Sequence, residues 1–200
     1  MANKLILLDA GHGGLTKGIY NTHPNKRVEK KHTQINEGVL NRAVVHLTAF
    51  LLDFHKIPCE VISGTNNDLS LNRRIWNVNE ASNHFDCLLI SVHHNFFGKP
   101  NPNGTEIFTY YSNNATAIAE RFYKTFIEHF PNRCFRKFSE SRPIKTGNFA
   151  ILKRTACPAI LTEFGFMSNE DDYYYISSSD GIMKQAEWLT DGCTQWYYSK

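Results

Sequence analysis

The chain has 200 residues, of which 42% are hydrophobic, so it is long enough for one well-buried domain and short for two. Its formal net charge of +3 comes from lysines and arginines scattered without a dense basic run, so nothing in the charge pattern indicates nucleic-acid binding. No apolar stretch approaches the roughly 20 residues of a membrane span, and LILL near the N-terminus is too short for the apolar region of a signal peptide. We therefore expect a single domain over residues 1–200, made in the cytoplasm, that binds no nucleic acid and does not insert stably into a membrane.

Apolar residues are spaced in ways that predict alternating strands and helices. Continuous apolar runs such as KLILLD indicate buried strands, and apolar residues at every third or fourth position indicate amphipathic helices. In chain order we predict a strand at 4–9, a helix at 36–54, a strand at 59–62, a helix that begins at Asp68 or Ser70, strands at 87–92 and 104–111, a helix at 115–130, a strand at 159–163 and a helix from about 181 to 198. This alternation is typical of a three-layer α/β fold, with a mostly parallel sheet flanked by helices on both faces.

The five cysteines are odd in number and far apart, and none stands in a CxxC or CxH arrangement. This spacing indicates neither a disulfide framework nor a thiolate metal site. We predict reduced thiols at all five positions, which are Cys59, Cys87, Cys134, Cys157 and Cys193.

Chemically useful side chains stand at the ends of three predicted strands. His12 follows the first strand, His93 follows the third, and Glu163 closes the fifth. Glu37 lies in the first turn of the long helix, where the helix dipole favours a carboxylate. Since the functional site of such folds lies at the carboxyl ends of the strands, we expect these side chains to share one site.

Two histidines and one carboxylate are a usual ligand set for catalytic zinc and leave a fourth position for water. Zinc lowers the pKa of such a water to about 7 and polarises a carbonyl group. A second, unligated carboxylate can then take the water proton and pass it to a leaving nitrogen. The pattern therefore predicts zinc-dependent hydrolysis of an amide bond.

Each of these residues also has a simpler explanation. A histidine after a strand is often only a hydrogen-bonded structural residue, and a glutamate at a strand or helix end can be a surface or capping residue. His94 directly follows His93, and strand alternation points the two to opposite sides, so only one should reach the site. Glu29, in the run RVEKKH, competes with Glu37 as a ligand.

Read in order, six segments resemble the successive motifs of the zinc-dependent N-acetylmuramoyl-L-alanine amidases of the amidase_3 type. These segments are LLDAGHGG, NEGVLNRAVVHL, DLSLNRRIWNVN, LLISVHHN, GTEIFTYY and PAILTEFGFMSNEDD. The resemblance runs from about Leu5 to the C-terminal helix. It implies that His12, Glu37 and His93 bind one zinc ion and that Glu163 is the catalytic glutamate.

The choice between Glu29 and Glu37 depends on helical register. A ligand at Glu29 would put KKHTQ where the apolar stripe of the helix should begin, whereas Glu37 is followed by an apolar stripe in register. We therefore predict Glu37. The chain departs from the family at Gly38, where lysine is commoner, and in the fairly long polar loop expected from Leu15 to Asn36.

Two other polar residues near these motifs are not expected to belong to the catalytic set. His94 stands where the family often has a small residue, and we expect it to face solvent or to pack on the sheet. Arg74, in SLNRR, resembles an arginine of a family helix, and we expect it to form a structural ion pair.

The implied function is peptidoglycan hydrolysis at the amide that joins N-acetylmuramic acid to the L-alanine of the stem peptide. Two alternatives stay open, namely a catalytically silent module that binds peptidoglycan or has a structural role at the wall, and a zinc peptidase or deacetylase that acts on another amide. Because the sequence shows no signal peptide and no wall-binding repeat, we expect a phage or prophage lysin or a virion-associated lytic subunit rather than an exported cellular amidase. Such a protein would reach the wall with the help of another factor.

Overall fold

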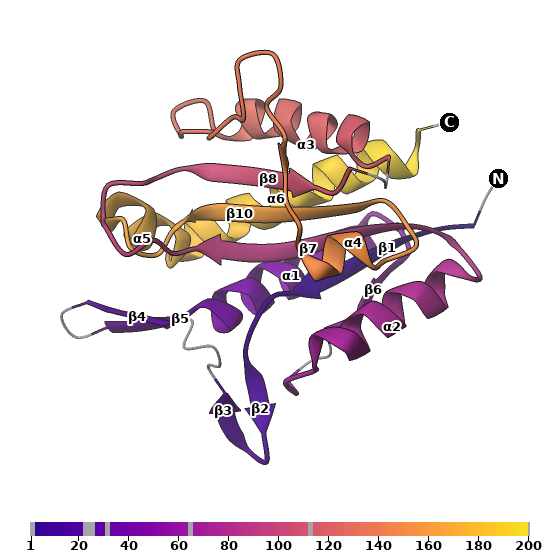
Figure 1. The fold of residues 1–200 in the computed structure, drawn as a ribbon, viewed down its shortest axis with the longest axis horizontal. Helices are drawn as coiled ribbons and strands as arrows, with labels where there is room; N and C mark the ends of the chain where they lie inside the picture. The colour runs from indigo at the N-terminus through magenta and orange to yellow at the C-terminus, as the bar shows by residue number, and fades with distance from the viewer. Residues whose placement is uncertain (1–2, 22–26, 31–32, 64–65, 112–113, 200) are drawn as a thin grey trace.

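The computed structural model describes residues 3–21, 27–30, 33–63, 66–111 and 114–199, and its centre is a six-stranded sheet with the strand order β6-β1-β7-β10-β8-β9 (Figure 1). The strands are β1 (Lys4–Ala10), β6 (Cys59–Val61), β7 (Asp86–Asn95), β8 (Thr105–Thr109), β9 (Lys145–Thr146) and β10 (Ala159–Phe166). Strands β6, β1, β7 and β10 run parallel, and β8 and β9 at one edge run in the opposite direction. The prediction of a mostly parallel sheet is confirmed.

Helices cover both faces of the sheet, as predicted (Figure 1). One face carries α1 (Glu37–Phe54), α3 (Thr116–His129), α5 (Glu170–Ile176) and α6 (Ser179–Tyr197), and the other carries α2 (Leu71–Ser82) and α4 (Ala150–Lys153). Side chains alternate along β1, so Ile6 and Leu8 belong to the larger core beneath α1 and α6. Leu5 and Leu7 belong to the smaller core beneath α2 and α4.

The two strands that carry His93 and Glu163 extend beyond their predicted ends. The structure continues β7 to Asn95 and β10 to Phe166, so His93 lies within its strand rather than just after it, and Glu163 lies within its strand rather than at its end. Their directions are therefore fixed by strand alternation.

At the start of α2, Ser70 is the N-cap residue and its side chain accepts a hydrogen bond from the backbone N–H of Arg73. This settles the choice between Asp68 and Ser70 as the residue at which the helix begins.

The prediction of a polar loop between residues 15 and 36 is wrong for the described part of that segment. It contains two antiparallel hairpins, formed by β2 (Gly14–Thr16) with β3 (Ile19–Asn21) and by β4 (Arg27–Lys30) with β5 (Thr33–Asn36). The sequence signal is weak because the strands have only three or four residues, and in the second hairpin the single apolar pair is Val28 opposite Ile35.

All five cysteines are free thiols, which confirms the prediction made from their spacing. Across the residues that the structure describes, no helix combines the length and the apolar character that crossing a membrane requires.

Candidate active site

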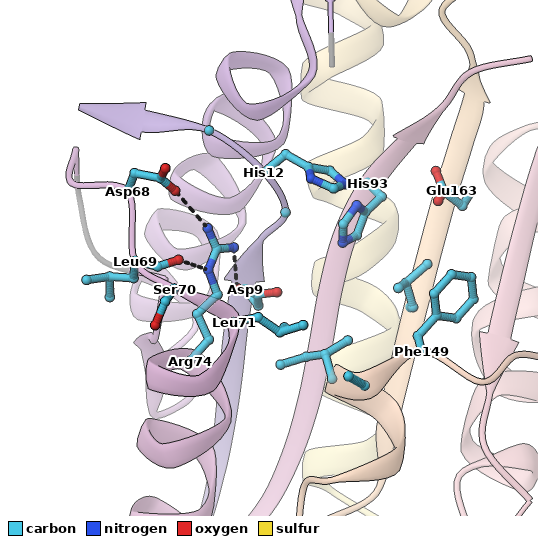
Figure 2. Close-up of a pocket in the computed structure, with 15 residues that line it drawn as sticks. Asp9, His12, Asp68, Leu69, Ser70, Leu71, Arg74, His93, Phe149 and Glu163 are labelled. Atoms are coloured by element: carbon cyan, nitrogen blue, oxygen red, sulfur yellow. Dashed lines mark hydrogen bonds and ion pairs between the residues drawn. The ribbon is translucent and has the colours of Figure 1, made fainter. Parts of the chain in front are cut away.

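The four predicted site residues come together at the carboxyl edge of the sheet. His12 lies in the turn after β1, Glu37 is the first residue of α1, and His93 and Glu163 lie on the neighbouring strands β7 and β10, where they are register partners. The rings of His12 and His93 meet edge to face with their centroids 4.9 Å apart. Figure 2 shows these two imidazoles side by side, with Glu163 beyond His93 on the next strand.

Three of these residues form a group that could hold a metal ion. One ligand atom each from His12, Glu37 and His93 lies within 4.8 Å of the other two. Oε1 of Glu37 is 3.8 Å from Nε2 of His12 and 3.1 Å from Nδ1 of His93. Two imidazole nitrogens and a carboxylate oxygen are the donor types of a catalytic zinc site, so the residues present fit this ion.

Glu29 lies away from this group. It is exposed on β4, where it pairs with Gln34 in the second hairpin. The structure therefore places Glu37, and not Glu29, beside the two histidines.

The carboxylates around His93 favour a positive charge at this position. Burial by itself lowers the pKa of His93, but the hydrogen bond to Glu37 and the charges of Glu163, Glu37 and Asp9 outweigh that effect, and the net pKa is raised. The negative charges of these carboxylates would equally favour a metal cation bound to His93 in place of the proton.

The glycine before His12 makes room for His93. A Cβ atom on Gly11 would lie 2.0 Å from Cε1 of the His93 ring, which is far inside van der Waals contact. The chain then passes through a left-handed turn, with φ of 54° at His12 and 64° at Gly13. These glycines therefore allow the strand to bend sharply and the two imidazoles to approach each other.

Two polar residues of α1, which the sequence analysis did not single out, hold this turn in place. The side-chain amide of Asn41 donates to the carbonyl of Gly11 at 2.7 Å. Arg42 donates to the carbonyl of His12 at 3.1 Å and to that of Gly13 at 2.5 Å. Both residues are buried, and buried polar groups on the inward face of a predicted helix are the signal that could have identified them.

His94 points to the opposite side of β7 from His93, as strand alternation predicts. It is buried against the sheet, with Nδ1 2.7 Å from Oδ1 of Asn41 and Nε2 3.0 Å from Oε1 of Gln185 on α6. Burial lowers its pKa to about 4, so the imidazole is neutral near pH 7. Because the amide nitrogen of Asn41 donates to Gly11, its Oδ1 accepts from Nδ1–H of His94. Nε2 of the neutral ring is then an acceptor, and the Gln185 side chain satisfies it with its NH₂ group once the amide oxygen and nitrogen are exchanged.

A cavity of about 530 Å³ opens beside His12, His93 and Glu163 on the side of the sheet that carries α2 and α4 (Figure 2). At its wall, Arg74 pairs with Asp9 at 3.0 Å, and Ser91 donates to the other oxygen of Asp9 at 2.7 Å. The structural ion pair predicted for Arg74 is confirmed. Apolar side chains line much of the remaining surface, namely Leu69, Leu71, Phe149, Ile151 and Leu161.

Replacing Gly11 with alanine should weaken metal binding by about tenfold or more, because the new methyl group forces the His93 ring out of position. The dissociation constant for Zn²⁺, measured by competition with a chelator, tests this expectation. Gly98→Ala is the matched control, since a Cβ there meets nothing within 4 Å. Equal metal affinities in the two variants would contradict the steric argument.

Sequence comparison finds relatives of the whole chain among cell wall amidases. Among curated proteins, a cell wall amidase of Bacillus anthracis described as uncharacterized is 28% identical, over 98% of this chain and 36% of its own length. The N-acetylmuramoyl-L-alanine amidase LytC of Bacillus subtilis is 26% identical, over 98% of this chain and 36% of its own length. This chain thus spans about a third of the length of these two relatives.

Among solved structures, an N-acetylmuramoyl-L-alanine amidase from Clostridium difficile 630 superposes with a TM-score of 0.82 at 24% identity, and the match covers 100% of each chain. At this identity the likeness establishes the fold. The model of the Amidase_3 family, described as N-acetylmuramoyl-L-alanine amidase, matches residues 6–195. With nearly its whole length matched, this chain belongs to the Amidase_3 family of N-acetylmuramoyl-L-alanine amidases.

Proposed function

We propose that this chain hydrolyses the amide bond between N-acetylmuramic acid and the L-alanine of the peptidoglycan stem peptide. The observation that carries the proposal is the position of Glu163, which faces the cavity next to the group formed by His12, Glu37 and His93. A metal-binding group and a separate carboxylate at the mouth of one cavity are the parts that metal-assisted amide hydrolysis needs. Membership in the Amidase_3 family supports the choice of substrate.

The proposed metal is zinc, held by His12, Glu37 and His93. When bound, zinc would supply a Lewis acid that polarises the scissile carbonyl and makes a water molecule more acidic. The two imidazoles would bind as neutral ligands, so metal binding would compete with protonation of His93.

Glu163 is the proposed general base and then the general acid. Its carboxylate takes a proton from the attacking water and delivers this proton to the nitrogen of the leaving L-alanine. Gly11 and the hydrogen bonds from Asn41 and Arg42 fix the turn that carries His12, so that the ligand side of the site stays in place during proton transfer.

We further propose that residues 1–200 act as one catalytic domain on the bacterial cell wall. The family match to residues 6–195 supports this extent. A role as a lysin that acts on the cell wall is the setting that we propose.

Mass spectrometry of soluble products tests the proposed reaction. The purified chain, loaded with zinc, is incubated with peptidoglycan beside a chelator-treated sample. We expect free stem peptides that begin with L-alanine in the zinc-loaded sample and none after chelation. Intact peptidoglycan, with the protein folded and metal bound, would instead indicate a silent binding module or a different amide substrate.

A further inference from the structure

A second buried carboxylate lies directly beside Glu163. In the antiparallel pairing of β8 with β10, Glu106 is the residue opposite Glu163. Opposite residues of such a pair place their side chains on the same face, about 5 Å apart. Glu106 therefore faces the same side of the sheet as Glu163 and His93, although the proposed reaction makes no use of it.

Two cations and one amide surround the Glu106 carboxylate. Nζ of Lys145 lies 2.5 Å and Nε of Arg136 2.8 Å from Oε1, and the amide of Asn95 donates to Oε2 at 3.0 Å. The Glu106 side chain is 7% exposed, whereas those of Lys145 and Arg136 are 22% and 37% exposed. Lys145 and Arg136 thus share one oxygen of Glu106 and form a basic cluster that stays partly exposed to solvent.

The strand order sets the direction in which a bound substrate must run. His93 on β7, Glu163 on β10 and Glu106 on β8 follow one another across the sheet. In the proposed reaction the scissile carbonyl faces the metal-ligand group and the leaving nitrogen faces Glu163. The peptide attached to that nitrogen therefore extends away from His93, toward β8 and the basic cluster.

The spacing of charges in a stem peptide matches this arrangement. The second stem residue is a glutamate joined through its side chain, which leaves its α-carboxyl group either free or amidated. In an extended chain this group lies roughly 6 Å from the nitrogen of the first residue, by standard bond lengths. Glu106, which both cations contact, lies one strand spacing, roughly 5 Å, from Glu163.

We propose that Lys145 and Arg136 form a subsite for the free α-carboxylate of the second stem residue. This inference rests on the proposed amidase function and adds a specificity to it. The ammonium and guanidinium groups bind a carboxylate through charge-assisted hydrogen bonds. A neutral amide at the same position forms only ordinary hydrogen bonds and is therefore bound more weakly. The chain therefore prefers stem peptides with γ-linked D-glutamate over those with D-isoglutamine.

Two N-acetylmuramoyl tetrapeptides that differ only in this carboxyl or amide group provide the test. We expect the wild-type chain to cleave the acid form with a kcat/KM about fivefold to twentyfold higher, mainly through KM. Lys145→Met and Arg136→Met should each lower kcat/KM for the acid form more than for the amide form, so that most of this advantage is lost. Lys145→Arg, which keeps the charge, should retain the preference.

Lys153→Met is the matched control, because Lys153 is an exposed lysine on α4, on the same side of the sheet, and its Nζ lies 5.9 Å from the centre of the Tyr110 ring. It should keep the wild-type preference. Equal kcat/KM values for the two substrates in the wild type, or an equal loss on both substrates in Lys145→Met, would overturn the proposal.

A binding measurement separates this proposal from the amidase function. The affinity of the Glu163→Gln variant for each tetrapeptide, measured by calorimetry, requires no turnover. If neither substrate is cleaved by the wild type but the acid form binds more tightly in a Lys145-dependent way, the amidase function fails and the carboxylate subsite stands. If the two forms bind alike, the subsite is refuted.

Discussion

Replacement of Glu163 by glutamine is expected to lower the rate of amide cleavage by about a thousandfold, while the fold and the metal content stay unchanged. Glutamine has nearly the same shape, but it cannot accept the water proton or return it to the leaving nitrogen. The side chain lies on β10 as the register partner of His93 and is not in the group of His12, Glu37 and His93, so metal binding should persist. The turnover number on an N-acetylmuramoyl peptide, the zinc content and the melting temperature are the measurements.

Glu140→Gln provides the comparison, since the side chain of Glu140 is 93% exposed and pairs with Lys137, which has no part in the proposed site. It should retain wild-type activity. A Glu163→Gln variant with more than about a tenth of the wild-type rate would show that another group performs the proton transfer.

The second large effect is expected at Glu37. Its side chain is 2% exposed and Oε1 lies 3.1 Å from Nδ1 of His93, so it faces the position where a cation is favoured. Glu37→Gln removes the negative charge and one anionic ligand, and should weaken zinc binding by more than about a hundredfold, with loss of activity at limiting zinc. Zinc affinity and product release, each measured over a range of zinc concentrations, test both parts.

Glu29→Gln is the decisive control, because Glu29 is the competing ligand in the sequence and lies exposed on β4. The variant should bind zinc like the wild type. The opposite result, with zinc lost from Glu29→Gln and kept by Glu37→Gln, would reverse the ligand assignment and the register argument behind it.

The residues of this site were predictable to the extent that local pattern determines their place. His12 and Glu163 follow or end continuous apolar runs, and Glu37 begins a long amphipathic helix, so each position can be derived from its own segment. The rule that parallel strands place their carboxyl ends at one edge then brings the segments together.

The hydrogen bonds and ion pairs around the four site residues depend on tertiary packing, so no pattern in the neighbouring sequence predicts them. The role of Asn41 requires the carbonyl of Gly11, 30 positions earlier, and that of His94 requires Gln185, 91 positions later. Glu106 meets Lys145 across 39 positions of sequence. The hairpins were missed for a different reason, since strands of three or four residues are too short to show a period.

The contacts of Arg42 also bear on how this part of the chain can vary. Arg42 binds the carbonyl of Gly13, where the chain leaves the sheet edge, and lies on the same helix that Glu37 begins when the chain returns. Both ends of the intervening excursion are thus anchored to a single helix. Because the entropic cost of closing a loop rises by only about 0.6 kcal/mol for each doubling of its length, a change in the length of this excursion costs little, and the contacts of Arg42 with His12 and Gly13 hold its starting point.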